Sequence, residues 1–365
     1  MSALVLDLFA GPGGWSVGAE RLGLPEVGVE WDRAACETAW AAGFHRDPMD
    51  VRDLDIDPGQ FGGLIASPPC QTFSAAGKGA GRAALSSLCE AVEWVSFGVS
   101  VGDALAVVHN PDLDERSALV LEPMRLIAQG RPEWIAMEQV PGVLPVWEAY
   151  AKALRAGFGY HVDTGLLHAE QFGVPQTRTR AFLVARQDRE VHLPVPTHSR
   201  YYPRNPSKLD PGVRPWVSMA DALDATTAMR SNYGTGGDPA ARGVREPWEP
   251  APTVTSKIGR NKWVPVHAVD GDETPLTWTG ERPSPTIVSS FAPDVVAAPG
   301  YRKAGDGPRQ KTPGSVRVTV AEAAVLQPFP PDHPWQGSKT AQYRQVGDAV
   351  PPLLAEAVLS VVAYR

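Results

Sequence analysis

The fold is decided close to the N-terminus, by the stretch Ala3-Leu4-Val5-Leu6-Asp7-Leu8-Phe9-Ala10-Gly11-Pro12-Gly13-Gly14. Its first seven residues are a short, mainly apolar run, which is typical of a buried strand. The glycines that follow let the backbone turn tightly and approach a ligand closely. Apolar residues then recur at helical spacing from Trp15 until Gly23, where a glycine is expected to end the helix. The pattern predicts a strand, a glycine-rich turn and a helix, the first unit of an α/β sheet.

The same alternation continues through the first 190 residues. Further strands are predicted at 27–30, 64–66, 134–138 and 181–185, and helices at 33–42, 117–129 and 147–156. Strands that alternate with helices form βαβ units, so we predict a parallel sheet covered on both faces. The tail, 349–363, is also predicted to be a helix and is expected to pack on this domain.

Composition sets the class of protein. The chain has 365 residues and 43% hydrophobic residues, enough for one large domain or two unequal ones and too apolar for general disorder. No apolar run approaches the roughly 18 residues of a membrane span, and no basic region precedes the first strand, so we expect a cytoplasmic protein without a signal peptide. The three cysteines show no CxxC spacing, which argues against disulfides and against a metal site. The net charge of −7, taken alone, argues against a nucleic-acid partner.

The middle of the chain has a different character. Residues 191–320 hold 18 of the 36 prolines, and residues 199–320 carry a net charge of +4, which leaves −11 for the remainder. Pro-Ala-Pro-Thr-Val at 250–254 recurs as Pro-Ser-Pro-Thr-Ile at 283–287, as expected of proline-started edge strands or turns. We therefore predict a catalytic domain at 1–190 plus 316–365 and a small, irregular β-rich domain at 191–315. The whole-chain charge of −7 conceals this basic region, so it does not exclude a nucleic-acid partner.

Acidic and aromatic residues after the first helix indicate a nucleoside site. Glu30 ends the second strand, 19 residues after Gly11, where a carboxylate binds ribose hydroxyls. Asp50 is placed to accept a hydrogen bond from an adenine amino group, and Trp31 either stacks on a purine or simply packs. The turn lacks the Gly-x-Gly-x-x-Gly spacing of a dinucleotide site and has no P-loop lysine. A nucleoside without phosphates fits better, and S-adenosylmethionine is the candidate.

A reactive group is predicted at the same edge of the sheet. The strand at 63–66 runs into Ser-Pro-Pro and then Cys70, at the carboxyl end of a parallel strand, where open α/β sheets bind ligands. Glu138 ends another strand, and Arg178 and Arg180 share one face of an extended segment. The other cysteines, Cys36 and Cys89, lie in apolar helical patterns and are expected to be packing residues.

These residues together resemble the DNA cytosine-C5 methyltransferases of bacteria and phages, over nearly the full length of the chain. Six ordered motifs carry the resemblance: Phe-Ala-Gly-Pro-Gly-Gly at 9–14, Pro-Cys-Gln at 69–71, Glu-Gln-Val at 138–140, Gln-x-Arg-x-Arg at 176–180, the segment 318–330, and Gln-Val-Gly-Asp-Ala-Val at 345–350. Amino-methyltransferases of DNA have an aromatic residue where Cys70 stands. The resemblance implies a Rossmann-like, class I S-adenosylmethionine-dependent domain with a target-recognition domain.

The resemblance also implies a mechanism. Cytosine C5 is too weak a nucleophile to take a methyl group directly, so a Cys70 thiolate adds to C6 and makes C5 carbanion-like. Glu138 would hold or protonate N3 of a flipped cytosine, Arg180 would contact O2, and Arg178 would support the pocket electrostatically. The sequence does not identify the base that removes the C5 proton.

The motifs indicate the contacts with the cofactor, and the basic region 191–315, which the resemblance makes the target-recognition domain, supplies most of the contacts with DNA. The expected cofactor contacts are Phe9, Gly11, Gly13, Gly14, Glu30, Trp31, Asp50, Pro69, Asp348, Ala349 and Val350. The expected DNA contacts are Gln71, Ser74, Lys78, Arg82, Arg230, Asn232, Tyr233, Lys257, Arg260 and Lys262. The glycine-rich, basic stretch 77–82 would close over the flipped base as a lid, or be a plain surface loop.

Three features depart from the family pattern. Gln139 stands where most members have Asn and is expected to shape the loop around Glu138. Asp348 also replaces Asn, where its carboxylate would repel that of the cofactor unless it binds the amino group; the preferred interpretation is an N-cap of the last helix. An insertion of unassigned role lies around 90–111.

Two other functions remain as alternatives. A tRNA cytosine methyltransferase uses the same motifs, but the proline-rich middle domain favours double-stranded DNA. A catalytically silent DNA-binding relative is expected to have lost Cys70 or Glu138, and both are present. A monomer is expected, in a host cytoplasm if the gene is phage-encoded, with a cognate restriction endonuclease as a candidate partner.

Overall fold

The computed structural model describes residues 4–69, 85–108, 110, 115–205, 207–223, 228–230, 244–256, 258–264 and 316–364. The strands are β1 Val5–Leu8, β2 Glu26–Glu30, β3 His45–Pro48, β4 Gly63–Ala66, β5 Trp134–Gln139, β6 His161–His168, β7 Thr179–Arg186, β8 Ala228–Arg230, β9 Val244–Arg245, β10 Lys262–Val264 and β11 Val316–Arg317. The α-helices are α1 Gly14–Arg21, α2 Arg33–Ala41, α4 Leu85–Ser96, α5 Val101–Val108, α6 Glu115–Ala118, α7 Glu122–Gly130, α8 Leu144–Phe158, α9 Met219–Leu223, α10 Val320–Leu326, α11 Lys339–Asp348 and α12 Pro352–Val362. Short 3-10 turns include η3 Leu119–Leu121, η5 Ala169–Phe172 and η7 Ile258–Arg260.

The larger sheet has seven strands in the order β3-β2-β1-β4-β5-β7-β6. β1 pairs in parallel with β2 and β4, and the parallel pairing extends to β3 on one side and β5 on the other. The prediction of a wholly parallel sheet was wrong at one edge, because β7 is antiparallel to both β5 and β6. The connection from β6 to β7 is short, and a short connection joins antiparallel strands, whereas parallel strands need a longer crossover.

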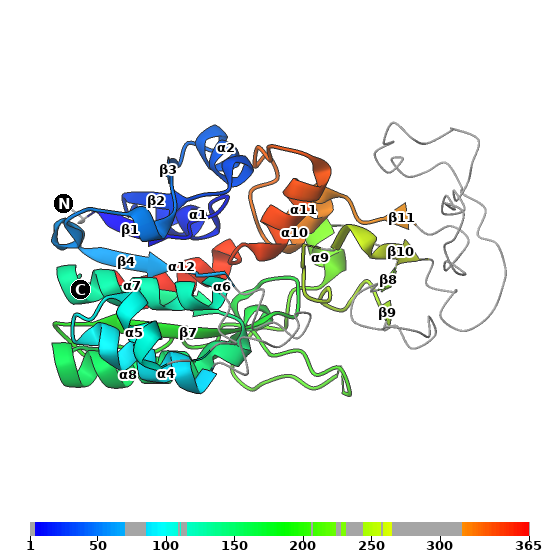
Figure 1. Cartoon of the computed structure of the whole chain (residues 1–365). Helices are drawn as coiled ribbons and strands as arrows, with labels where there is room; N and C mark the ends of the chain where they lie inside the picture. The colour runs from blue at the N-terminus through cyan, green and yellow to red at the C-terminus, as the bar shows by residue number, and fades with distance from the viewer. Residues whose placement is uncertain are drawn as a thin grey trace, which may run out of the picture.

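Helices cover both faces of this sheet (Figure 1). On one face α4, α7 and α8 pack over alternate strand residues such as Leu6, Leu64 and Met137. On the other face α1 and α12 pack over the intervening residues, such as Val5 and Ile65. Every strand residue in the centre is therefore buried, as expected of a sheet with two covered faces.

One predicted helix is interrupted. The pattern at 117–129 predicts a continuous helix, but the structure has α6, the 3-10 turn η3 and then α7. Pro123 stands in the first turn of α7, where proline is tolerated, and it cannot continue a helix from the preceding turn. The tail helix α12 begins at Pro352 rather than at 349, for the same reason.

A second, four-stranded antiparallel sheet has the order β11-β10-β8-β9 and lies at one end of the molecule, beyond α10 and α11 (Figure 1). Its core includes Met229 and Trp263 and is continuous with residues of α10 and α11, such as Leu326 and Val346. β11 belongs to this sheet although the predicted boundary assigned Val316 to the catalytic domain. The domain boundaries themselves remain a prediction.

The stretch Lys339–Val362 has the length and apolar composition of a membrane span, but 67% of its most apolar window is buried inside the structure. Helix α12 packs on α1, β5 and β7. This packing accounts for the apolar character of the helix.

Candidate active site

A cavity of about 360 Å³ opens at the carboxyl ends of β1, β2, β4 and β5. It lies where the strand order reverses, between β1 and β4, which is where open α/β sheets bind ligands. The predicted site residues that line it are Phe9, Gly11, Gly14, Glu30, Trp31, Asp50, Pro69, Glu138, Arg178, Arg180, Asp348, Ala349 and Val350. Gly13 does not line the cavity; it is the N-terminal cap residue of α1.

The turn between β1 and α1 adopts a left-handed backbone at three positions. Gly11 has a φ of 58° and Gly13 a φ of 111°, and Phe9 has a φ of 61°, which costs a non-glycine residue about 1–3 kcal/mol. Gly14, the first residue of α1, lies so close to Val350 that a side-chain Cβ would overlap the Val350 carbonyl oxygen. The geometry of the turn therefore requires glycine, and it brings the C-terminal segment against the start of α1.

The side chain of Arg46 on β3 supports this turn through hydrogen bonds. Its Nε donates to the Gly11 carbonyl at 3.1 Å and its Nη2 to Ser16 Oγ on α1 at 2.6 Å. Its Nη1 forms a 3.0 Å ion pair with Glu26, and the side chain is wholly buried. A Cβ on Gly28 would lie 2.6 Å from Nη1, so glycine on β2 leaves room for the guanidinium. The Arg46 contacts therefore join β3 to the turn and to the first helix.

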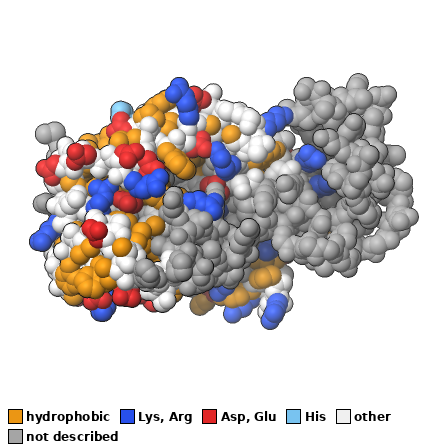
Figure 2. Space-filling view, viewed as in Figure 1, with side chains coloured by type: hydrophobic (Ala, Val, Ile, Leu, Met, Phe, Trp, Pro, Cys, Tyr) orange, Lys and Arg blue, Asp and Glu red, His pale blue; other side chains and the backbone are white. Residues whose placement is uncertain are grey.

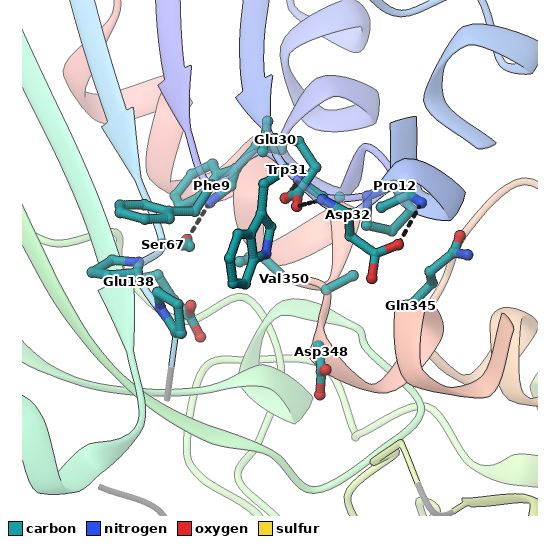
Figure 3. Close-up of a pocket in the computed structure, with 18 of the residues that line it drawn as sticks. Phe9, Pro12, Glu30, Trp31, Asp32, Ser67, Glu138, Gln345, Asp348 and Val350 are labelled. Atoms are coloured by element: carbon teal, nitrogen blue, oxygen red, sulfur yellow. Dashed lines mark hydrogen bonds between the residues drawn. The ribbon is translucent and has the colours of Figure 1, made fainter. Parts of the chain in front are cut away.

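The end of the cavity beside β2 carries the residues predicted to hold a nucleoside (Figure 3). The Glu30 carboxylate accepts hydrogen bonds from two backbone N–H groups, at 2.9 and 2.7 Å, and each oxygen keeps a further lone pair. Burial raises the pKa of Glu30, and the two hydrogen bonds oppose this rise. Trp31 is 67% exposed, with its ring standing in the cavity. The side chain of Asp50 pairs with Arg52, which lowers the pKa of Asp50.

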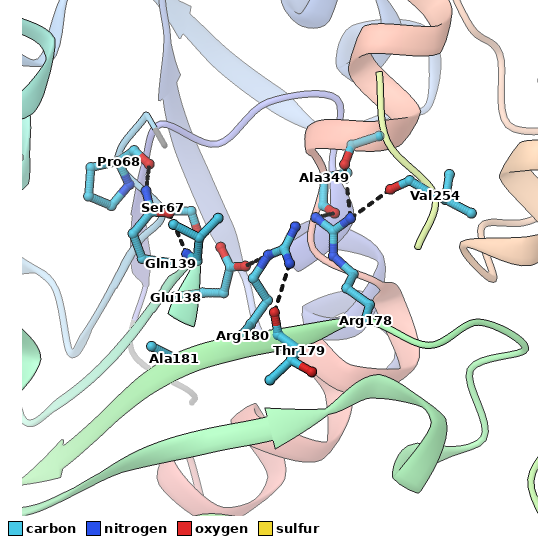
Figure 4. A network of polar contacts seen from close by, with 12 residues as sticks. Ser67, Pro68, Glu138, Gln139, Arg178, Thr179, Arg180, Ala181, Val254 and Ala349 are labelled. Atoms are coloured by element: carbon cyan, nitrogen blue, oxygen red, sulfur yellow. Dashed lines mark hydrogen bonds and ion pairs between the residues drawn. The ribbon is translucent and has the colours of Figure 1, made fainter. Parts of the chain in front are cut away.

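Glu138 and Arg180 face each other at the opposite end of the cavity (Figure 4). Arg180 Nε lies 3.0 Å from Glu138 Oε1, and both side chains are largely buried. Ser67 also hydrogen-bonds Glu138, and the Ser67 hydroxyl oxygen accepts a 2.9 Å hydrogen bond from Trp15 Nε1. Burial raises the pKa of Glu138, and Arg180, Arg178 and Ser67 oppose this rise.

Gln139 joins the end of β5 to the Pro-Pro turn after β4. Its Nε2 donates to the Pro68 carbonyl at 2.5 Å, and its Oε1 accepts from the backbone N–H of Val140. These contacts agree with the expectation that Gln139 shapes the loop beside Glu138. Cys70, the residue after this Pro-Pro turn, lies outside the described residues.

Arg178 binds backbone rather than the open cavity. Its guanidinium donates to the carbonyls of Val254, Gly347 and Ala349 at 2.9–3.1 Å. Gln176, also buried, accepts from the Val254 N–H at 2.8 Å. The Gln-x-Arg pair thus ties β7 to segment 250–254 and to the end of α11. These contacts favour a structural role for Arg178 alongside the predicted electrostatic one.

The interpretation of Asp348 as an N-cap was wrong. Asp348 is the last residue of α11, and the N-terminal cap position of α12 is Pro351, with no side-chain cap hydrogen bond. Pro351 occupies the cap position and Pro352 is the first residue of α12. Asp348 therefore lies before the position from which a side chain could cap this helix. Its side chain is exposed, and the residue is part of the cavity lining.

Most of the predicted DNA contacts cannot be placed. Seven of them, Gln71, Ser74, Lys78, Arg82, Asn232, Tyr233 and Lys257, lie outside the described residues, as does the proposed lid at 77–82. Arg230 and Arg260 are described only in their backbone, at the end of β8 and in η7, and Lys262 begins β10 next to β8. On the face shown in Figure 2, described Lys and Arg side chains mix with Asp and Glu.

Sequence reasoning missed four polar residues of the site and its support: Asp32, Arg46, Ser67 and Arg344. Asp32 carried a signal, because it precedes a helix and accepts hydrogen bonds from the first amides of α2. Arg344 pairs with Asp32 from 312 residues away. Contacts of this kind have no local sequence pattern. Among the parts of the chain described, no group of three His, Cys, Asp or Glu side chains is arranged to hold a metal.

The fold and the cavity define a Rossmann-like, class I methyltransferase with a second, four-stranded sheet. The model of the C-5 cytosine-specific DNA methylases matches residues 4–92 and 108–363, and the chain belongs to this family. It is a DNA cytosine-5 methyltransferase that uses S-adenosylmethionine as methyl donor. The gap between the two matched ranges lies inside the expected insertion at 90–111. In the structure this gap covers the end of α4 and most of α5.

Relatives of this chain match it over nearly its full length. The type II methyltransferase M1.HphI of Haemophilus parahaemolyticus is 28% identical and aligns over 99% of this chain and 87% of its own. M.NgoMIV of Neisseria gonorrhoeae is 27% identical over 97% and 95%. The crystal structure of Dnmt2 from S. pombe shares the fold, with a TM-score of 0.58 at 16% identity over 99% and 98% of the two chains.

Proposed function

We propose that the cavity binds S-adenosylmethionine along β1 and β2 and receives a flipped cytosine beside β4 and β5, within a specific double-stranded DNA sequence. The observation that carries this proposal is the buried Glu138–Arg180 pair in the same cavity as Glu30 and Trp31. One end of the cavity suits a nucleoside and the other suits a base with adjacent nitrogen and oxygen atoms.

The half of the cavity along β1 and β2 is assigned to the cofactor because its side chains suit the chemical groups of a nucleoside. The free lone pairs of Glu30 suit ribose hydroxyls, and the exposed ring of Trp31 suits the face of adenine, whose burial would be favourable. Asp50 is ionised and would accept from the adenine amino group. Phe9, Pro69, Ala349 and Val350 would enclose the ligand with Gly11 and Gly14 of the turn. Bound there, the cofactor supplies the electrophilic methyl group.

In the half of the cavity beside β4 and β5, the side chains are proposed to control the protonation and charge of the cytosine. The raised pKa of Glu138 favours the protonated acid, which donates to cytosine N3 as the Cys70 thiolate adds to C6. C5 then takes the methyl group and a base removes the C5 proton. The Cys70–C6 bond breaks to release the thiolate, and the N3 proton returns to Glu138, which leaves the neutral methylated base. Arg180 uses one N–H for Glu138 and one for the Thr179 carbonyl, and an arginine has five, so others serve cytosine O2.

Double-stranded DNA is proposed rather than tRNA. The relatives that match at 27–28% identity over nearly the full chain are type II methyltransferases, whereas the likeness to Dnmt2 concerns the fold alone. We further propose a cytoplasmic monomer that modifies DNA in concert with a restriction endonuclease.

Transfer of tritium from labelled S-adenosylmethionine to unmethylated DNA and to tRNA tests the proposal. We expect label in DNA, and a loss of at least about a thousandfold in Cys70→Ser because the adduct cannot form. Cys89→Ser is the matched control, because Cys89 is half-buried in α4 and is expected to leave transfer unchanged. DNA containing 5-fluorocytosine should form a covalent complex with the wild-type protein but not with Cys70→Ser. Equal trapping by both proteins would contradict the assignment of Cys70 as the nucleophile. Label in tRNA alone would show that tRNA, rather than DNA, is the substrate.

A further inference from the structure

The chain between β7 and α9 contains a loop rich in basic residues, 197–214, which we call the basic loop; the structure describes all of it except Pro206. The loop has a net charge of +3, because it holds four cations against one carboxylate: Arg200, Arg204, Lys208 and Arg214 against Asp210. All four cations are exposed, and within the described part of the chain none of them forms an ion pair. Figure 2 shows Lys and Arg side chains at the lower edge of the molecule, at the place of this loop in Figure 1.

The basic loop is held together by a tyrosine and by its one carboxylate. Lys208 Nζ lies 4.0 Å from the centre of the Tyr202 ring, and the Arg200 guanidinium lies 5.9 Å from it. The Tyr202 hydroxyl donates to one oxygen of Asp210 at 2.7 Å, and the Arg200 backbone N–H donates to the other at 2.8 Å. These contacts order two of the cations in advance, which lowers the entropy that a partner loses on binding them.

The base of the loop is attached to the large domain. The backbone N–H groups of Thr197 and His198 both donate to the Gln171 carbonyl in η5, at 3.0 Å, and the N–H of Ser199 donates to the Arg214 carbonyl at 2.7 Å. A hollow of about 400 Å³ lies between the loop and His168, the last residue of β6. The loop therefore stands beside the edge strand of the large sheet rather than on the small sheet.

This position puts the basic loop next to the candidate active site. Because β7 is antiparallel to β5 and β6, its first residues lie at the same edge of the sheet as the last residues of those two strands. Glu138 and Arg180 are at this edge, and the loop extends it on the side of β6, away from Glu30 on β2. A duplex that places one base in the cavity continues past this edge, and it carries one negative charge per about 1.7 Å of its axis.

We propose that the basic loop binds the phosphate backbone of double-stranded DNA beside the flipped base, through Arg200, Arg204, Lys208 and Arg214. Phosphate contacts fix the position of a protein on the duplex but carry no sequence information. The loop therefore increases the affinity for any duplex and leaves the reading of the target sequence to other residues. This inference rests on the proposed DNA substrate.

Fluorescence-anisotropy titrations of the full-length protein at several KCl concentrations test the inference, with two duplexes of about 30 base pairs that are unrelated in sequence. The variant combines Arg204→Gln with Lys208→Gln. We expect the slope of log Kd against log[KCl] to become shallower by about 2 for both duplexes, because each phosphate contact contributes about 0.9. Calorimetric binding of S-adenosylhomocysteine should stay within about twofold, since the cofactor site is untouched.

The matched control combines Arg131→Gln with Lys152→Gln, which removes the same charge from exposed sites before β5 and on α8. Its salt slope should stay within about 0.5 of the wild type. In tritium transfer to plasmid DNA at about 0.1 M KCl, the loop variant should raise KM for DNA about tenfold with kcat unchanged.

An unchanged slope in the loop variant would overturn the inference, and so would an equal change in the control, which would reduce the effect to net charge. Weaker binding of only one of the two duplexes would also overturn it, by assigning the loop to sequence readout. Either result beside normal methyl transfer to DNA leaves the proposed function intact. Failure of the wild type to bind either duplex would overturn the proposed substrate as well.

Discussion

The orientation of Glu138 depends on a hydroxyl that the motifs do not include. Trp15 Nε1 is only a donor, so the lone pair of Ser67 that accepts from it is occupied and the Ser67 proton is directed to Glu138. In the proposed mechanism Ser67 is therefore a positioning residue for Glu138. Because it donates to the charged form of Glu138, it also holds the pKa of that group lower than burial alone would set it.

Ser67→Ala is expected to lower kcat about tenfold while S-adenosylmethionine binding stays within about twofold, because one hydrogen bond of about 1 kcal/mol is lost at the acid alone. The pKa of Glu138 should rise, so the alkaline limb of the pH–rate profile should move to higher pH. Steady-state kinetics across pH measure both effects. Trp15→Phe, which keeps an aromatic ring against Phe182, should shift the same limb less. A loss of rate with an unmoved profile would show a merely structural role.

Helix α11 joins the large domain to the small one through a glycine. At Gly347, any Cβ would overlap the backbone of Thr255 and Ser256, so the helix and segment 255–256 touch without side chains between them. The Arg178 guanidinium reaches the Gly347 carbonyl in the same place. This contact sets where Asp348 and Ala349 enter the cavity.

Gly347→Ala is expected to destabilise the protein by more than about 2 kcal/mol, because backbone must move to admit a methyl group. Gly157→Ala is the matched control near the end of α8, where a Cβ meets open space. That change should stabilise the protein by about 0.5–1 kcal/mol, since alanine is the better helix former. Urea unfolding of both variants gives the comparison, and equal effects would contradict the close approach at Gly347.

His333 connects the segment between α10 and α11 to the glycine-rich turn before α1. Its Nε2 lies 3.2 Å from the carbonyl oxygen of Pro12 in the glycine-rich turn, and its ring packs with Phe329 and Trp335. A carbonyl only accepts, so Nε2 carries a hydrogen. Burial lowers the pKa of His333 to about 4, against an ordinary value of 6.5.

The lowered pKa of His333 makes stability depend on pH. Between pH 6.5 and 4 the unfolded chain binds a proton that the folded protein does not, so stability falls as the pH falls through this range and is fully present above it. Relative to His333→Gln, which stays neutral, the wild type should lose about 3 kcal/mol of unfolding free energy from pH 7 to pH 4. Glu170, whose pKa burial raises to about 7, is common to both proteins and cancels in the difference. Parallel stability curves would contradict a neutral, buried His333.

Much of the large domain was predictable because its signals are local. The apolar run and glycines at 3–14, the strand ending in Glu30 and the strand ending in Glu138 each appear within a few residues of sequence. The structure places these elements together at one edge of the sheet. The small sheet was predictable only as an irregular β-rich region, because its four strands span two to three residues each and are paired across long separations.

The sequence by itself determined the family and the cofactor and predicted the residues that we propose for the chemistry, because turns, strand ends and motif spacings are properties of neighbouring residues. Only the tertiary structure decided how those residues are held. It showed that β6 and β7 run antiparallel, that Arg46 braces the glycine-rich turn, and that Arg178 binds backbone carbonyls. It also moved Asp348 from a helix cap to the cavity wall. Each of these depends on atoms brought together from distant parts of the chain, where hydrogen bonding and burial, rather than spacing, decide the outcome.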